Sequence, residues 1–405
     1  MPLCECLVGS TCHPLSNFES SGRNDLSELV LHIGTKKTGT TFIQRYLNAN
    51  SAKLQKQGWQ YPAFVDNANH LRYAVPFQKT ITKEHRQRGI VDDASRAEFI
   101  EAIDAELAAH VKPDHRWIMS SEHFSSRLQT REEVEQAVGL LRRHFDQITV
   151  VVMFRRQEFM FPSIYSQTIK DGGSAAWSWE FCEARLSELD YAAMLARWTD
   201  AVGAANIRAT PYLEARKGGD EFLRDFGALT GISFGVDWVK PRDLAANQSL
   251  NAEGIAFMRV VNPYIPFLRA DDSPNYGLRQ AAITEVMKLT TGPGFRPGPE
   301  VIDKITDSYT ATNADFVQSL GSTEQWREWL DQPIHSGRPP VDVPDISAER
   351  VAALMVQLAE PNGPVAWGRP AGRPLRLQEM AAVVGRRSLE KVSPKGIGKR
   401  KRSQK

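Results

Sequence analysis

The hydrophobic positions of this 405-residue chain form two kinds of pattern. Short, almost wholly apolar runs have the length of buried β-strands. Longer stretches repeat apolar residues every three or four positions, as the buried face of a helix does. The alternation of the two predicts an α/β fold in which helices flank a central, mainly parallel sheet. The expected strands are 29–33, 117–119, 148–154 and 206–213, and the expected helices include 40–48, 51–57, 94–110 and 130–145.

Helical spacing continues beyond residue 260, in segments separated by proline and glycine. Segments at 280–289, 301–320 and 348–358 predict a helical C-terminal extension. Trp326, Trp329 and Trp367 are expected to pack this extension on the core. The predicted parts are a disordered leader at 1–25, an α/β core at 26–260, the extension at 261–370 and a basic, disordered tail at 371–405.

Composition excludes several classes of protein. A net charge of +2 gives no argument for a specific nucleic-acid partner. The longest apolar run has the length of a strand, and no secretory signal is evident, so we expect a cytoplasmic protein without a transmembrane segment. Adhesion of the basic tail to a membrane surface is the alternative, and the oligomeric state is open.

Four cysteines in a chain of this length do not make a disulfide framework. Cys4, Cys6 and Cys12 match no standard zinc spacing, so no metal site is expected. Cys182 is expected to be a small buried hydrophobic residue.

The stretch GTKKTGTT, from Gly34 to Thr41, joins the first expected strand to a helix. Gly34 and Gly39 allow a sharp turn and close approach to a ligand, and the amides that open the helix would point at an anion. The stretch therefore predicts a phosphate-binding loop. A Walker A loop has lysine directly after its second glycine, whereas here Thr40 holds that place and Lys37 lies inside the loop.

A second anion site is predicted at the end of strand 148–154. Arg155 and Arg156 follow this strand, where a Walker B strand would end in aspartate to hold magnesium. Two guanidinium groups suit a phosphate dianion instead. Ser163, eight residues after Arg155, has a spacing that could return its hydroxyl to the same anion.

Together these motifs resemble sulfotransferases that use 3′-phosphoadenosine 5′-phosphosulfate (PAPS), and bacterial members in particular. The loop is similar to their 5′-phosphosulfate loop, although Lys36 stands where that family usually has proline. Arg155 and Ser163 are similar to their 3′-phosphate site, and the resemblance covers about residues 28–260.

The resemblance implies a P-loop-type three-layer fold and transfer of a sulfuryl group to a hydroxyl or amine, with carbohydrates among the candidate acceptors. PAPS is then the co-substrate, no metal is needed, and Lys37 is catalytic. The implied contacts to PAPS come from Lys37, Thr38, Gly39, Thr40, Thr41, Arg155 and Ser163.

The catalytic base is sought at the end of strand 117–119, because ligands of open α/β sheets bind beyond the carboxyl ends of strands. Glu122 and His123 both lie there, and we prefer Glu122. Adjacent residues on an extended strand end point to opposite sides, so one of the two should face the acceptor. His70 is a weaker candidate for substrate binding, since such a histidine is more often a polar loop residue.

Two other functions stay open. A P-loop kinase of small molecules would need ATP and magnesium, and the missing Walker lysine and strand-end aspartate count against it. A non-catalytic nucleotide-binding protein is the second alternative. The sequence does not identify the acceptor, because Trp177, Trp179 and Phe181 could stack on a sugar or aromatic ring or fill a helix face. The triplet at 216–218 spells a phosphate motif of cytosolic sulfotransferases, but its mid-chain position predicts a solvated turn.

Overall fold

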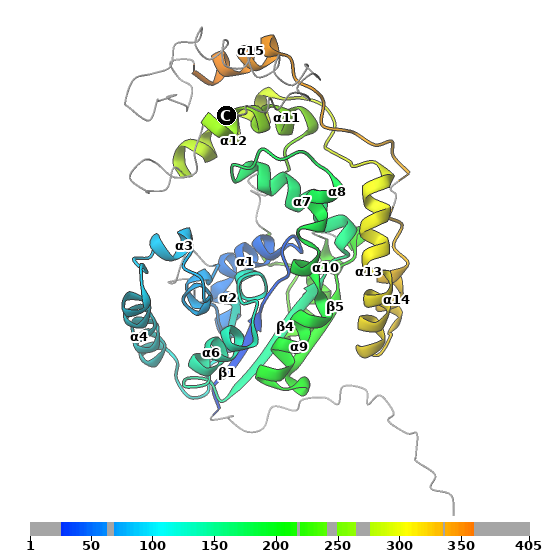
Figure 1. Ribbon diagram of the computed structural model, residues 1–405. Coiled ribbons are helices and arrows are strands. Elements are labelled where there is room, and N and C mark those ends of the chain that lie inside the picture. Colours follow the sequence, from blue (N-terminus) through cyan, green and yellow to red (C-terminus); the bar gives the residue numbers. More distant parts are fainter. Residues whose placement is uncertain are drawn as a thin grey trace, which may run out of the picture.

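The computed structural model of the protein describes residues 26–62, 69–216, 219–240, 249–264, 276–334 and 337–359. The predicted leader with its three cysteines, Trp367, the tail and two residues of the triplet at 216–218 lie outside these ranges. No helix within them is long and apolar enough to cross a membrane. Figure 1 shows a central sheet with helices around it and a group of helices above it.

Within the described residues, five strands form one sheet, all parallel, in the order β2-β3-β1-β4-β5. The expectation of a central, mainly parallel sheet flanked by helices is confirmed. Because β1 is the middle strand, the loop that follows it emerges at the centre of the carboxyl edge. The strands are β1 (Glu28–His32), β2 (Trp59–Gln60), β3 (Arg116–Ser120), β4 (Gln147–Phe154) and β5 (Ile207–Pro211).

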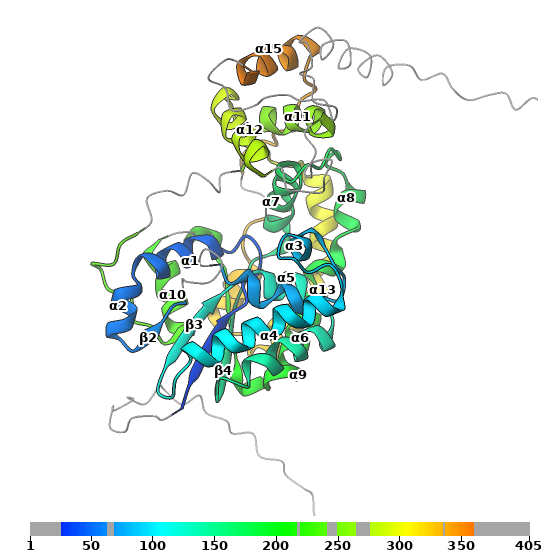
Figure 2. The same ribbon diagram turned by 90° about the vertical axis from the view of Figure 1, so that its left-hand side faces the viewer.

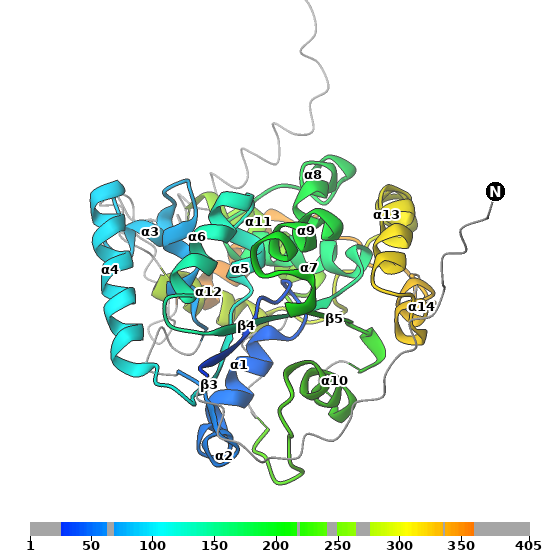
Figure 3. The same ribbon diagram turned by 90° about the horizontal axis from the view of Figure 1, so that it is seen from below.

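Alternate residues of each strand serve the two faces of the sheet and divide the core into two layers. In β1, Leu29 and Leu31 belong to one apolar cluster and Val30 belongs to the other. Figure 3 shows helices on both sides of the sheet. The first side carries α4 (Asp93–His110), α6 (Arg131–Leu141) and α9 (Tyr191–Val202), and the second carries α1 (Thr40–Ala49), α2 (Ser51–Lys56) and α10 (Asp220–Thr230).

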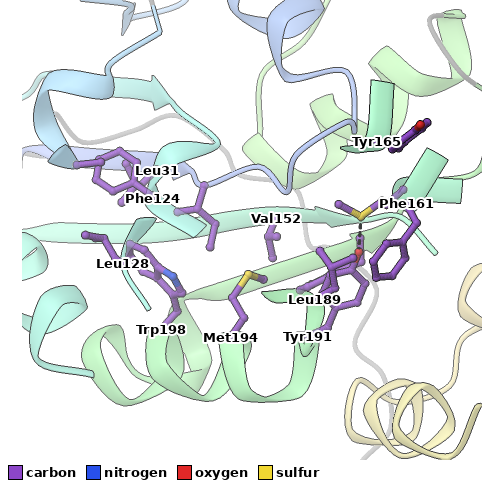
Figure 4. Packing of buried hydrophobic residues seen from close by; sticks show 14 of the residues in the cluster. Leu31, Phe124, Leu128, Val152, Phe161, Tyr165, Leu189, Tyr191, Met194 and Trp198 are labelled. Atoms are coloured by element: carbon purple, nitrogen blue, oxygen red, sulfur yellow. Dashed lines mark hydrogen bonds between the residues drawn. The ribbon is translucent and has the colours of Figure 1, made fainter. Parts of the chain in front are cut away.

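Large side chains of α9 pack against the sheet within the larger cluster. Figure 4 shows Met194 and Trp198 beneath the strand that carries Val152. Trp198 is fully buried and packs edge-on against Phe124, with 6.1 Å between ring centroids. Burial of such residues stabilises the fold by roughly 25 cal/mol per Å² of apolar surface.

The C-terminal helices form two groups. α13 and α14 lie beside β5 and α9, whereas α11, α12 and α15 stack beyond α7, as Figure 2 also shows. Trp326 and Trp329 are buried in the main cluster, which confirms their expected packing. The boundaries at residues 260 and 370 stay a prediction. The helices are α7 (Gln157–Lys170), α11 (Ala252–Val261), α12 (Tyr276–Leu289), α13 (Pro299–Ser319), α14 (Glu324–Leu330) and α15 (Ala348–Ala359).

Short helices complete the described chain. The α-helical ones are α3 (Lys83–Arg86), α5 (His123–Arg127) and α8 (Trp179–Glu183). The single-turn helices are η2 (Leu71–Tyr73), η3 (Val75–Phe77), η4 (Leu186–Leu189), η5 (Ala204–Asn206), η6 (Glu214–Arg216) and η8 (Asn262–Tyr264).

Candidate phosphate-binding and active site

The loop between β1 and α1 has the turns that its glycines predict. Gly34 and Gly39 have φ angles of 75° and 79°, in the region that favours glycine. Lys37 also lies there, with φ of 64°, which the sequence pattern did not indicate. The hydroxyl of Thr35 donates to the carbonyl of Met153 at 3.1 Å, so the loop is fixed to β4.

Two threonine hydroxyls of the loop form hydrogen bonds within the loop itself. Thr38 Oγ1 donates to the carbonyl of Thr35 at 2.6 Å, and Thr40 Oγ1 donates to the same oxygen at 3.3 Å. Both residues are buried, so their contact with an anion would come from backbone N–H groups. Gly39 caps α1 without a side-chain hydrogen bond, and Thr40 and Thr41 begin its first turn. The first-turn N–H groups and the helix dipole make this end attractive to an anion.

The amine of Lys37 reaches α7. Its Nζ donates to Oε1 of Gln167 at 3.0 Å. Burial and, to a smaller extent, the neighbouring Lys170 lower the pKa of Lys37 to about 8, against the opposing effects of Asp171 and Glu122. The amine is therefore a cation at neutral pH and loses its proton more readily than an exposed lysine.

Arg155 and Ser163 meet, as their spacing predicts. Nη1 of Arg155 lies 3.4 Å from the hydroxyl of Ser163 and 3.2 Å from the backbone carbonyl of Lys37. The guanidinium therefore joins the strand end, α7 and the loop. Its other edge is held by Glu214, which accepts from both Nε and Nη2. The side chain of Arg155 is only 7% exposed.

Arg156 does not share this site, so the expected pair of guanidinium groups is wrong. Its Nη2 pairs with the carboxylate of Glu158 at 2.6 Å, and its Nη1 donates to the carbonyl of Leu330. Successive residues leave a strand end in different directions, which turns Arg156 towards α14. Arg156 is thus a buried structural cation.

Glu122 lies directly against the loop. A methyl group added at Gly34 would come within 2.8 Å of Cα and Cβ of Glu122. The carboxylate is oriented by α1, because Gln44 Nε2 donates to Glu122 Oε2 at 3.1 Å and to the carbonyl of Ser120 at 3.1 Å. The preferred base therefore stands beside the predicted phosphate loop.

The expectation that Glu122 and His123 alternate along an extended strand is wrong. β3 ends at Ser120, and Glu122 has the helical angles of the residue that precedes α5. Burial lowers the pKa of His123, although Glu122 acts in the opposite direction. Its Nδ1 is buried without a hydrogen-bond partner among the described residues, and this burial disfavours the charged imidazolium.

His70 has a structural position. Its side chain is 0% exposed, and its Nδ1 accepts from the backbone N–H of Ser120 at 3.0 Å. The other ring nitrogen lies 3.2 Å from the carbonyl of Pro62. Since both nitrogens serve the backbone, this placement does not fit the predicted contact with a substrate.

Two further sequence features are also structural. Arg216 forms ion pairs with Asp225 at 3.3 Å and Glu328 at 3.0 Å, so it is anchored and not part of a solvated turn. The ring of Trp177 packs on Tyr165 and Phe295, each at 5.4 Å, which favours the filling of a helix face. Cys182 is buried as expected.

Comparisons with known proteins add little. No protein-family model and no curated protein matches this sequence. Among solved structures, a sulfotransferase from Alicyclobacillus acidocaldarius is similar over 74% of this chain and 98% of its own, with 14% identity and a TM-score of 0.41. A likeness this distant supports no functional argument, so the function must be argued from the site.

Proposed function

We propose that this chain transfers a sulfuryl group from PAPS to a hydroxyl or amine of a small molecule or glycan. The observation that carries the proposal is the position of the Arg155 guanidinium. Its Nη1 reaches both the Ser163 hydroxyl and the carbonyl of Lys37. The groups proposed for the two ends of one nucleotide, the 3′-phosphate and the 5′-phosphosulfate, are therefore in contact.

The described residues fit such a donor. The loop offers turned backbone N–H groups and a half-buried lysine, and Arg155 with Ser163 offers a cation and a hydroxyl. At the end of β4 the chain has a guanidinium where a magnesium-dependent nucleotide enzyme would have a carboxylate. This difference favours the sulfotransferase over the kinase.

In the proposed reaction, an acceptor oxygen or nitrogen attacks sulfur in line with the bond that breaks. The new bond to sulfur forms while the bond from sulfur to the bridging phosphate oxygen is lost. Glu122 takes the acceptor proton, with His123 as the alternative base. The Lys37 cation balances the negative charge that develops on the departing phosphate oxygen. Adenosine 3′,5′-bisphosphate then leaves.

Incubation with radiolabelled PAPS and a panel of sugars, phenols and amines tests the proposal, with and without a chelator. We expect label on at least one acceptor class at a rate that the chelator does not change. Transfer of phosphate from ATP that requires magnesium would favour the kinase. Binding of the bisphosphate without transfer to any acceptor would favour a non-catalytic protein.

A further inference from the structure

Glu214 is an acid that the proposed reaction does not use, yet it contacts the cation proposed for the 3′-phosphate. It is the first residue of η6, shortly after the end of β5, and is 59 positions from Arg155 in the sequence. Its two carboxylate oxygens accept from Nε and Nη2 of the guanidinium, the second at 2.9 Å. Glu214 therefore occupies one of the edges at which an arginine can grip an oxyanion with two parallel hydrogen bonds.

The two partners differ in how easily they can move. The side chain of Arg155 is 7% exposed, and its Nη1 is held between Ser163 and Lys37. The side chain of Glu214 is 28% exposed. The backbone N–H of Glu214 donates to Gln332 at 3.0 Å, which fixes the chain at this point. The carboxylate can thus turn towards solvent without moving the main chain, while the guanidinium stays in place.

A phosphate dianion on Arg155 would face the carboxylate on the same guanidinium. Two like charges this close repel each other, less strongly where water screens them. The bisphosphate product carries the same 3′-phosphate as the donor. A carboxylate that competes for Arg155 therefore weakens the binding of both the donor and the bisphosphate, and it favours release of the bisphosphate.

We infer that Glu214 is an internal competitor for the 3′-phosphate, which limits the affinity of the site and lets the nucleotide product leave. The inference rests on the proposed function, because it assumes that Arg155 binds this phosphate. Glu214 acts through Arg155 and contacts no reacting atom, so it is a positioning residue.

Isothermal titration calorimetry with adenosine 3′,5′-bisphosphate tests this competition. We expect Glu214→Gln to bind the bisphosphate roughly tenfold more tightly than the unmutated chain, because the amide keeps the shape and removes the charge. Adenosine 5′-monophosphate, which lacks the 3′-phosphate, should bind both proteins equally. Glu221→Gln is the matched control, since Glu221 lies 3.7 Å from Arg216 and is a solvent-exposed acid of the adjacent helix.

A second pair of variants covers the case in which the single change prevents folding by leaving a buried cation unpaired. Arg155→Gln alone is compared with Arg155→Gln combined with Glu214→Gln, where neither charge of the pair remains. The double variant should bind the bisphosphate more tightly than the single one, because the repelling carboxylate is gone.

The outcomes separate the two proposals. If the unmutated chain does not bind the bisphosphate, the proposed function fails and this inference fails with it. If the unmutated chain binds it and the Glu214 variants bind equally or more weakly, the inference alone is overturned. A gain of the same size in Glu221→Gln would also overturn it, since the effect would then be one of net charge.

Discussion

At the scale of single residues, Lys37 has a constrained backbone and a perturbed side chain. A non-glycine residue with φ of 64° costs on the order of 1 kcal/mol, and the carbonyl of this residue accepts from Arg155. The side chain is half-buried, and its amine is held by Gln167. Strained residues persist where the surroundings fix them, and they cluster at functional sites. This combination is a reason to test the lysine first.

Lys37→Ala should nearly abolish sulfuryl transfer and leave affinity for adenosine 3′,5′-bisphosphate largely intact. Alanine keeps Cβ, so the backbone strain stays the same, while the charge at the departing oxygen is lost. Initial rates with radiolabelled PAPS and calorimetry with the bisphosphate measure the two effects. Lys36→Ala is the control, since its neighbouring amine has no role in the proposed step. Full activity of Lys37→Ala would contradict the mechanism.

The lowered pKa of Lys37 predicts an alkaline limit of activity. The amine is charged below about pH 8 and neutral above it, so kcat/KM for PAPS should fall as pH rises through this value. Folding disfavours the charged form, so this group's penalty to stability is present below about pH 8 and disappears as pH rises towards 10.5. Lys37→Arg should move the alkaline limb upwards, because a guanidinium stays charged. An unchanged limb in that variant would assign it to another group.

Glu122→Gln should lower kcat by roughly two to four orders of magnitude with donor affinity nearly unchanged, because the amide keeps the contact with Gln44 and cannot take a proton. His123→Asn should cost far less. Steady-state kinetics on both variants decide the matter. A severe loss in the histidine variant with a mild one in the glutamine variant would reverse the assignment of the base.

The site residues differ in how far the sequence could place them. Arg155 and Ser163 could be paired, because one strand end and one helix fix their separation. Glu214 and Gln167 could not, since their contacts with Arg155 and Lys37 depend on strand order and on the direction of α7. The polar character of His70 did not indicate that its ring accepts a hydrogen bond from the backbone of β3.

At the scale of elements, the predictions held where a local signal ends a segment. The helix expected from residue 130 begins as α6 at Arg131, where Thr130 and Glu133 form a reciprocal cap. The end of β3 was misjudged, because Ser121 keeps one backbone bond to β1 while Glu122 already turns towards α5. The two-residue strand β2 was missed, since its length is too short for any periodicity to show.

The loop between β1 and α1 gives a prediction of its own. Gly34→Ala should cost about 1–3 kcal/mol of stability and most of the activity, because the new methyl group meets Glu122 at 2.8 Å in a backbone region that disfavours alanine. Gly58→Ala is a matched control, with φ of 79° and nothing within 4 Å of the added carbon. Denaturant melts and transfer assays compare the two. Equal activity in both variants would mean that Gly34 serves only the turn.

At the scale of the whole molecule, the helices α13 and α14 share the core of the sheet. The ring of Phe154, at the end of β4, lies 4.8 Å from Phe316 of α13 and 6.2 Å from Trp326 of α14. Arg156, two residues after Phe154, donates to the carbonyl of Leu330. β4, which ends at the proposed phosphate site, therefore packs directly against α13 and α14.

This continuity predicts that the sheet and α13–α14 unfold together. Trp329 is 0% exposed, so Trp329→Ala should cost about 3–5 kcal/mol and lower the denaturant midpoint of the whole transition. Far-UV circular dichroism, tryptophan emission and loss of bisphosphate binding should give coincident curves. Val356→Ala, at a residue that is 41% exposed on α15, should change the midpoint little. An early transition in Trp329→Ala that leaves bisphosphate binding at its original midpoint would show that these helices fold apart from the site.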